Sequence, residues 1–319
     1  KRIGSHVKKI LTALVNAIDS DHFPDGADQV RALPERFEFG RAIPFIFLHM
    51  GCLGVIWTGW SWVAVGVAIA LYFVRMFAVT AFYHRYFCHR AYHTSRPMQF
   101  IFAIIGLTAM QRGPLWWASV HRHHHAHSDE DVDAHSPVAK GFLWAHIGWL
   151  TSSKNFPTDY KLVRDLVKFP ELVFLNRFDV IGPIALFAVL FGFGAMLEML
   201  APGLGTSGWQ MVIWGFFIST TVLFHGTCFV NSLAHTMGSK RFDNDDDSRN
   251  SLFLALITLG EGWHNNHHQY QASARQGFYW WEIDISYYLI RLMGLLGIVR
   301  DIKSVPEKVY EQAASRVAS

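Results

Sequence analysis

Histidine is concentrated in three short windows of this sequence, residues 84–89, 121–125 and 264–268, which hold half of its 18 histidines. In the second and third windows, histidines recur three and four residues apart, so an α-helix would place three imidazoles on one face. Asn231 and His235, four residues apart, add a further pair. Imidazole nitrogen binds iron, copper, zinc and nickel, so this spacing predicts a metal centre without choosing the metal.

The number of candidate ligands predicts more than one metal ion. The three windows supply two, three and three spaced imidazoles, and the additional pair supplies one imidazole and one amide. This total exceeds the about four to six ligands that one such metal ion takes. The pattern therefore suits two metal ions.

Other interpretations of the histidines remain open at this point. A single histidine on an apolar face is usually a packed structural residue, which is our interpretation of His93, His127, His135, His146 and His225. The second window alone would also fit a metal-buffering tract or an exposed loop. A haem held by two histidines would need facing histidines inside membrane spans, and only His49 and His225 come close to this arrangement.

The composition indicates that lipid surrounds the elements that position these windows. Hydrophobic residues make up 51% of the chain and charged residues 17%, against roughly 25% charged in an average soluble domain. Four apolar segments approach or reach the roughly 20 residues needed to cross a membrane: residues 43–57, 62–82, 180–200 and 211–230. We therefore expect an all-α integral membrane protein with four transmembrane helices in two hairpins.

A cytoplasmic helical cap is expected to complete a single domain, residues 1–319. The loops at 58–61 and 201–208 contain no Lys or Arg, so the 28 basic residues lie on the opposite face. The positive-inside bias predicts that this face is cytoplasmic, with both termini and the histidine windows. The cap would consist of residues 83–179 and 231–319.

Several shorter features are assigned to the membrane surface. We expect interfacial helices, too short or too polar to cross, at residues 7–18, 98–110 and 278–299. Arg75, late in the second span, is expected to extend to the headgroups. The net charge of +3 and the lack of a basic stripe exclude nucleic acid as a partner.

The three windows resemble the histidine boxes of the membrane fatty-acid desaturase family, H-x(3,4)-H followed by two copies of H-x(2,3)-H-H. The surrounding segments are similar to the stearoyl-CoA Δ9 subgroup, in a bacterial-type chain, and the resemblance covers roughly residues 43–300. These segments include Gly113 to Trp117, Ser128 and Asp129, Asp133 to Pro137, Gly141 to Trp149, Asn231 to His235 and Gly260 to Trp263.

The resemblance implies a centre of two Fe²⁺ ions that uses O₂ to place a cis double bond, at Δ9, in a saturated acyl chain. No catalytic side chain is implied beyond the metal centre, and His123 occupies a variable position. The implied ligands, with Asn231 acting through a water, are His84, His89, His121, His124, His125, His235, His264, His267 and His268.

Substrate contacts are predicted on the second span and in the cap. Tyr72 and Met76 lie about three and two helical turns before the first box. They are expected to close an acyl tunnel, as a tyrosine does in the subgroup, with Trp117 and Trp149 lining it; the alternative is that Tyr72 and Met76 face lipid or a neighbouring helix. The subgroup often has a small residue where this chain has Met76. The bulkier methionine predicts a preference for chains of about 16 rather than about 18 carbons.

Two departures from the subgroup bear on the partners. Animal acyl-CoA members carry Arg-Asp before the second box, where this chain has Ser119-Val120, so the acyl carrier stays open between a CoA thioester and a lipid. No haem-binding electron carrier follows Glu311, which implies a separate donor of the ferredoxin, rubredoxin or cytochrome b5 type with its reductase.

Three rival functions share part of this pattern. A membrane di-iron hydroxylase of an alkyl or acyl chain uses related boxes and is the main alternative. A metal transporter would place its ligands within the spans, and a soluble ferritin-like desaturase would need two Glu-x-x-His pairs, of which the chain has only Glu261 to His264.

Overall fold

The computed structural model describes residue 15 and residues 18–317. The predicted helix at 7–18 therefore lies outside the described residues, except for Val15 and Ile18.

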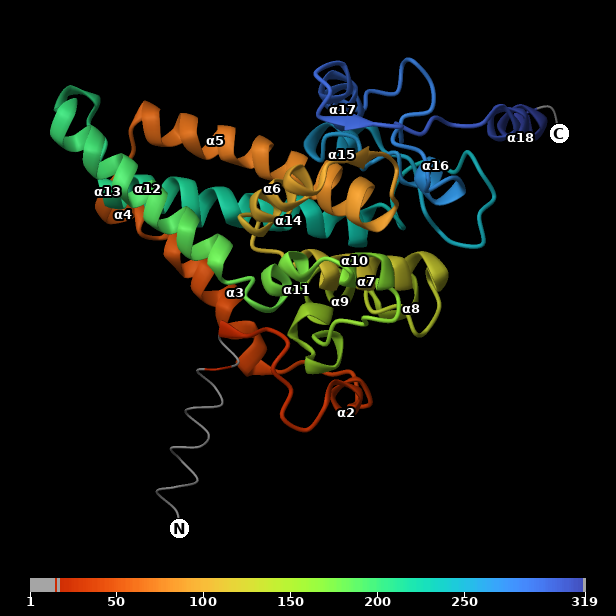
Figure 1. The fold of residues 1–319 in the computed structure, drawn as a ribbon, viewed down its shortest axis with the longest axis horizontal. Coiled ribbons are helices and arrows are strands. Elements are labelled where there is room, and N and C mark those ends of the chain that lie inside the picture. Colours follow the sequence, from red (N-terminus) through yellow and green to blue (C-terminus); the bar gives the residue numbers. More distant parts are fainter. Residues whose placement is uncertain (1–14, 16–17, 318–319) are drawn as a thin grey trace, which may run out of the picture.

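Four helices of the described chain are long and apolar enough to cross a membrane, as the sequence predicted. They lie together at one end of the molecule (Figure 1). Helix α3 (Phe39–Cys52) continues into α4 (Val55–Thr58), and α12 (Ile181–Leu200) stands alone. The other two spans are composite: α5 (Trp62–Phe77) with the π-helical segment η1 (Ala78–Cys88), and α13 (Gly208–Met211) with the π-helical segment η5 (Val212–Ile218) and α14 (Ser219–Leu233).

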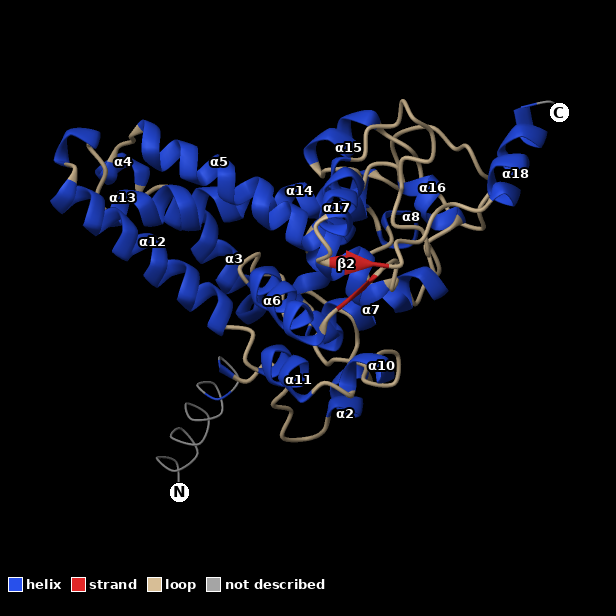
Figure 2. Cartoon of the chain, turned by 45° about the horizontal axis from the view of Figure 1, so that its top comes forward, coloured by secondary structure: helices blue, strands red, loops and turns tan. Residues whose placement is uncertain are grey.

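The rest of the described chain is built from short helices and one two-stranded sheet (Figure 2). Strand β1 (His93–Thr94) pairs antiparallel with β2 (Val299–Arg300). The 3-10 turns are η2 (Gly148–Thr151), η3 (Ser153–Asn155) and η4 (Pro202–Leu204). The α-helices are α2 (Ala27–Arg31), α6 (Arg96–Leu107), α7 (Pro114–Ala126), α8 (Pro137–Lys140), α9 (Phe142–His146), α10 (Arg164–Val167), α11 (Pro170–Arg177), α15 (Leu252–Ile257), α16 (His264–Gln269), α17 (Ile285–Leu295) and α18 (Glu307–Val317).

Two segments expected at the membrane surface form short apolar helices. Residues 98–110 largely coincide with α6, and residues 278–299 contain α17 and the start of β2. Both helices are shorter than the four spans. Their placement at the headgroups stays a prediction.

The second span is longer than its apolar run, because its end is held by the cap. The apolar pattern stops near Phe82, but the helix continues through η1 to Cys88, with all its side chains buried. Phe82 stacks on Phe102 of α6 at 3.9 Å between ring centroids. Tyr83 packs so closely on Gly106 that an added Cβ there would lie 2.0 Å from its ring. Helix α6 therefore fixes the turn that carries the first histidine box.

Helix α7, which carries the second box, starts at a defined point. Pro114 occupies its first turn, where the missing N–H costs no hydrogen bond. The side-chain oxygen of Asn176 on α11 accepts a hydrogen bond from the Trp116 backbone N–H at 2.8 Å. This contact satisfies one of the free N–H groups at the start of the helix.

Arg75 does not reach the headgroups, so that prediction was wrong. Its side chain is only 1% exposed and lies among α5, η5 and α14. The guanidinium donates to Thr220 Oγ1 at 2.6 Å and to Ser219 Oγ at 2.7 Å. These two hydroxyl groups of the neighbouring span are acceptors in the interior of the helix bundle. Charged side chains within membranes usually face such an interior.

Candidate metal centre

Five imidazoles from three separate elements point their Nε2 atoms at one place. His84 lies on η1 and His89 directly after it, His121 and His125 lie on α7, and His267 lies on α16. The Nε2 atoms follow one another at 2.9 to 3.0 Å, in the order His84, His267, His125, His121, His89. These five residues are called the first histidine group.

Hydrogen bonding alone cannot account for the first histidine group. An imidazole nitrogen carries either a proton or a lone pair, so a nitrogen with two such contacts must accept in both. His267 and His125 contact each other, and each has a second contact of this kind, so they cannot both be acceptors. A cation between the nitrogens satisfies all of their lone pairs, and the arrangement therefore fits a metal ion.

Four further imidazoles form the second histidine group, with ligand atoms within 4.8 Å of one another: His124, His235, His264 and His268. Three carboxylates contact the Nδ1 atoms of three of these histidines. Asp133 is 2.8 Å from His124 Nδ1, Asp129 is 2.8 Å from His235 Nδ1, and Asp246 is 2.6 Å from His268 Nδ1. These contacts fix the tautomers so that Nε2 is free to bind a metal, as is common around metal-bound histidines.

A carboxylate also orients His84 of the first group. Glu261 Oε2 lies 2.5 Å from His84 Nδ1. Arg85 in turn donates to Glu261 Oε1 at 3.2 Å, and Glu261 is almost fully buried. The His84 ring is thus held with Nε2 toward His267 before any metal binds.

Burial keeps most of these imidazoles neutral. It lowers the pKa of His268 to about 4, although the hydrogen bond that His268 donates to Asp246 acts to raise it. Burial likewise lowers the pKa well below its usual value for His89, His121, His125, His264 and His267. Neutral imidazoles offer lone pairs at physiological pH, which a metal site requires.

The carboxylates remain charged in the same environment. Burial raises the pKa of Asp129, but the hydrogen bonds that it accepts from His235, Ser136 and the Asp247 backbone N–H outweigh this effect and lower the pKa to about 2. His135 and His124 likewise bring the pKa of Asp133 below its usual range despite burial. Their negative charges would partly compensate a metal dication held by the histidines.

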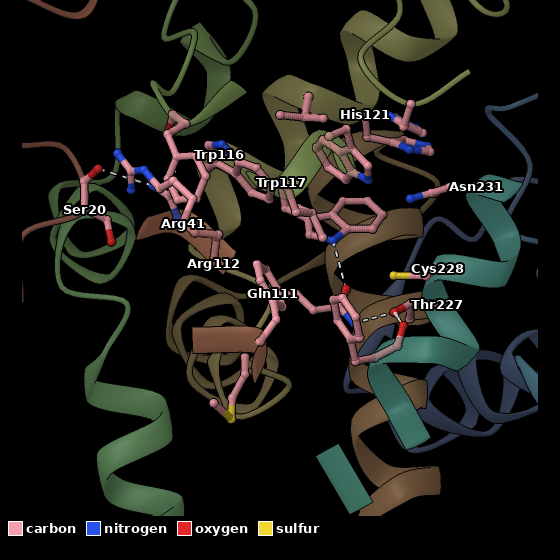
Figure 3. A pocket seen from close by; sticks show the side chains of 18 of the residues that line it. Ser20, Arg41, Gln111, Arg112, Trp116, Trp117, His121, Thr227, Cys228 and Asn231 are labelled. Carbon is pink, nitrogen blue, oxygen red and sulfur yellow. Dashed lines mark hydrogen bonds between the residues drawn. The ribbon is translucent and has the colours of Figure 1, made fainter. Parts of the chain in front are cut away.

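A cavity of about 880 Å³ reaches both histidine groups from one side. His84, His121, His124 and His264 form part of its wall. Figure 3 shows Trp117 next to His121, with Gln111 linking it to Thr227 through hydrogen bonds of 3.3 and 2.8 Å. Polar residues near one end include Asp19, His22 and Arg41, whereas the far end contains Met76, Val79 and Thr220.

Three of the four predicted substrate residues line the cavity, and the fourth does not. Met76, Trp117 and Trp149 line the cavity. Tyr72 does not, because its hydroxyl donates to the Ile257 carbonyl at 2.5 Å. Its ring and Met76 both lie against Gly226. Tyr72 therefore lies in the layer behind the end of the cavity.

The structure brings the nine implied histidine ligands together, and Asn231 lines the cavity beside them. His123 lies outside both groups, with its ring 4.9 Å from that of His127. His135, interpreted as structural, lines the cavity and stacks on His124 at 4.6 Å between centroids.

Sequence reasoning missed the carboxylates that orient the ligands. Asp129, Asp133 and Glu261 belong to the segments that carry the family resemblance, but nothing in their spacing gave them a role. Asp246 lies in the acidic run of residues 243–247, which looks like a solvated loop. Only the folded chain shows it against His268.

The comparisons with known proteins agree with this geometry. The profile of the fatty acid desaturase family matches residues 60–291. An acyl-CoA 5-desaturase of Anemone leveillei is 38% identical over 272 residues, which cover 84% of this chain and 80% of that protein. An sn-1 stearoyl-lipid 9-desaturase of Anabaena variabilis is 37% identical over 267 residues, 83% of this chain and 93% of that protein.

A third relative, an sn-2 palmitoyl-lipid 9-desaturase of Nostoc, is 34% identical over 252 residues, which cover 77% of this chain and 84% of that protein. The family profile matches most of the chain, and these relatives match it over most of their own length. This chain belongs to the fatty acid desaturase family.

Proposed function

We propose that this protein is an O₂-dependent acyl desaturase that places a cis double bond at Δ9 of a saturated fatty-acyl chain. One observation carries the proposal: the two histidine groups, of five and four imidazoles, contribute His84, His121, His124 and His264 to the wall of a large cavity that Met76 and Val79 of the second span also line. The volume of about 880 Å³ is in the range of cavities that enclose a whole ligand.

The two histidine groups are proposed to hold two Fe²⁺ ions. Bound there, iron would supply the activation of dioxygen that removal of hydrogen from an unactivated methylene requires. The histidines would be the ligands of the iron ions. Four carboxylates would hold ligand rings in orientation through their Nδ1 atoms: Asp129, Asp133, Asp246 and Glu261. Asn231 lines the cavity within this wall, which agrees with a ligand role through a water.

The cavity walls are proposed to position the acyl chain and exclude water. Trp116 stacks on Trp149, with centroids 5.9 Å apart, and Trp117 packs against His121 at 5.0 Å. These rigid indoles confine a flexible chain next to the histidine groups. Such positioning matters because a misplacement of about 1 Å can reduce the rate about a hundredfold.

Met76 is proposed to set the length of chain that fits. It is fully buried and lines the far end of the cavity, with Tyr72 behind it. The acyl carrier would lie at the polar end, near Arg41 and His22. The similar proteins include both an acyl-CoA and acyl-lipid desaturases, so we leave both carriers as candidates.

A separate one-electron donor is proposed to approach through a second opening. A smaller cavity of about 400 Å³ is lined by His89, His125, Arg122 and Gln271. It shares no lining residue with the large cavity, so an acyl chain in place would leave it accessible. A donor of the ferredoxin, rubredoxin or cytochrome b5 type would reach the first histidine group from this side.

We also propose that the four spans form two hairpins across the cytoplasmic membrane, with the histidine groups and both termini in the cytoplasm. The connections at 59–61 and 201–207 are short, and neither contains a basic residue. The basic residues therefore lie toward the other end of the spans, as the positive-inside bias requires.

The deciding experiment is expression in a host that lacks its own desaturase, followed by mass spectrometry of the total fatty acids. A new monounsaturated acid with its double bond at Δ9 is expected, and it should disappear in the His267→Ala variant. A hydroxylated acid in its place would favour the hydroxylase alternative. Purified protein that is active but contains no iron would contradict the metal assignment.

A further inference from the structure

The large cavity is open beside the first turns of the first membrane span. Five residues of α3 line it, at a spacing that puts them on one face of the helix: Gly40, Arg41, Pro44, Phe45 and Leu48. Gly40 and Pro44 are also exposed, so they belong both to the cavity wall and to the outer surface of the span. A Cβ added at Gly40 would meet nothing within 4 Å. The cavity therefore opens sideways, next to the start of α3.

The outer surface next to this opening is apolar. Phe37 and Phe39 are 58% and 67% exposed, and Leu33 and Ile43 are exposed as well. Leu33 also lines the cavity. Because α3 and α4 together are long and apolar enough to cross a membrane, these side chains, at and just before the start of the span, face lipid once it is inserted. An acyl chain can then pass from the bilayer into the cavity without crossing water.

Arg41 offers two free donor nitrogens at this opening. Its Nε donates to Ser153 Oγ at 3.3 Å, and its guanidinium lies 3.9 Å above the ring of Phe156. No residue of the described chain accepts a hydrogen bond from its Nη1 or Nη2. Figure 3 shows Arg41 on the side of the cavity away from His121 and Asn231. A flat pair of N–H groups held in this way suits the oxygens of a phosphate.

The other arginine of the cavity wall, Arg112, is fully occupied by protein partners. Its Nε donates to Asp179 at 3.1 Å, and its Nη1 and Nη2 donate to the Phe156 and Ser20 carbonyls, each at 3.3 Å. The wall contains no lysine. In the described chain, Arg41 is therefore the one arginine or lysine of the wall that can bind an anionic group with both terminal nitrogens.

The segment that surrounds the opening is negatively charged. Residues 19–41 contain three arginines and twice as many carboxylates: Arg31, Arg36 and Arg41 against Asp19, Asp21, Asp25, Asp28, Glu35 and Glu38. Three cations near this end are already paired with these carboxylates: Arg31 with Asp28, Lys140 with Glu35, and Arg177 with Asp19. A ligand with many negative charges would therefore be repelled here.

This charge balance separates the two candidate acyl carriers. A CoA thioester has a phosphate monoester and a diphosphate, which together carry about four negative charges at neutral pH. A glycerophospholipid has one phosphodiester, whose single charge one arginine can compensate. If its headgroup is zwitterionic, its ammonium group is attracted to the carboxylates around the opening.

We propose that the acyl substrate is a chain of a zwitterionic membrane glycerophospholipid, which enters from the bilayer beside α3 while Arg41 binds the headgroup phosphate. This proposal rests on the proposed desaturase function and names its acyl carrier. A CoA thioester is then a poor substrate, because the opening lacks the cations that its phosphates need.

The first test compares two carriers of the same acyl chain. Purified, iron-loaded wild-type enzyme in nanodiscs of dioleoyl phosphatidylcholine receives O₂ and a ferredoxin with its reductase. The substrate is either palmitoyl-CoA or a phosphatidylethanolamine that carries one palmitoyl and one oleoyl chain, in both positional arrangements. Mass spectrometry of the intact phospholipid and the intact thioester shows which of them loses two hydrogens. We expect the phospholipid to be desaturated at least about 10-fold faster.

The second test assigns the headgroup contact. Arg41→Gln should raise the apparent KM for the phospholipid about 10-fold, because a charged hydrogen-bond donor is lost. Its kcat, iron content and thermal unfolding midpoint should stay close to those of the wild type. Arg36→Gln is the matched control, since Arg36 is an exposed arginine of the same segment that lies outside the cavity wall. This variant should have the KM of the wild type.

Desaturation of palmitoyl-CoA at the rate of the phospholipid or faster would overturn the proposal and leave the desaturase function intact. An unchanged KM in Arg41→Gln, or an equal rise in Arg36→Gln, would overturn the role of Arg41. The comparison of carriers uses the wild type alone, so it decides even if a variant fails to fold. If neither carrier is desaturated, the proposed function itself is contradicted.

Discussion

At the scale of single residues, a carboxylate at Nδ1 leaves Nε2 free to bind a metal in four of the nine histidines: His84, His124, His235 and His268. Asp133, Asp129 and Asp246 each occupy the Nδ1 of one ligand, which leaves Nε2 for the metal. Histidine spacing alone does not give this information, because these carboxylates come from two loops, one directly after α7 and one more than 100 residues further along the chain.

The ligand assignment predicts different results for two neighbouring histidines. His124→Ala should abolish desaturation and lower the bound iron, because His124 belongs to the second histidine group. His123→Ala should keep both, because its ring faces His127. Elemental analysis and product assays check this. Equal loss in both variants would refute the assignment.

The low pKa values of the buried histidines predict acid-sensitive stability. The folded chain holds His268 neutral down to about pH 4, while an unfolded histidine takes a proton near pH 6.5. This contribution to stability is therefore complete above about pH 6.5 and is lost as the pH falls toward 4. The thermal unfolding midpoint and iron content of detergent-solubilised protein, measured from pH 7.5 to 4.5, should both decrease. A flat profile would contradict this prediction.

Met76 should control which chain length is preferred. The wild type is expected to favour chains of about 16 carbons, and Met76→Ala should shift the product ratio toward about 18, because a shorter side chain deepens the cavity. Paired 16- and 18-carbon substrates analysed by gas chromatography provide the measurement. Tyr72→Phe, which loses only the hydrogen bond to Ile257, serves as the control for changes behind the cavity. An unchanged ratio in Met76→Ala would remove this residue from the cavity end.

At the scale of elements, the first box depends on how closely α6 approaches η1. Gly106 permits this approach, since any Cβ there would overlap the ring of Tyr83, the residue before His84. We expect Gly106→Ala to displace η1, lower the iron content and destabilise the fold by about 1 to 3 kcal/mol. Gly66→Ala on α5 is the matched control, because nothing lies within 4 Å of an added Cβ. Iron content and thermal stability of both variants decide the question, and similar values would show that the close contact is unimportant.

The sequence predicts the four membrane spans well, but not the long-range contacts that bury polar residues on the second span. The four spans were predicted to within a few residues, because apolar runs of nearly 20 residues have few alternatives. The buried end of the second span was missed, because polar residues such as His84 and Arg85 stop the apolar pattern although the cap buries them. Arg75 was misplaced for a related reason. Its acceptors Ser219 and Thr220 lie about 145 residues further along the chain, and no local pattern connects them.

At the scale of the whole molecule, the predicted orientation places the polar end of the cavity and both histidine groups on the cytoplasmic side. A reporter fused at the C-terminus should then be protected in intact cells, and a cysteine introduced at Gly205 should react with an impermeant reagent from outside. Gly205 has a left-handed backbone, with φ of 60°, in an open turn. Labelling of a cysteine introduced near His121 from outside would reverse the assigned orientation.

The two cavities share no lining residue, although both reach the first histidine group. An acyl chain in the large cavity and a donor at the small one therefore do not compete for space, and a ternary complex of enzyme, acyl substrate and electron carrier is sterically allowed. The enzyme has no need to release one partner before it admits the other. Under the proposed function, electrons could therefore reach the first histidine group while the acyl chain stays in place.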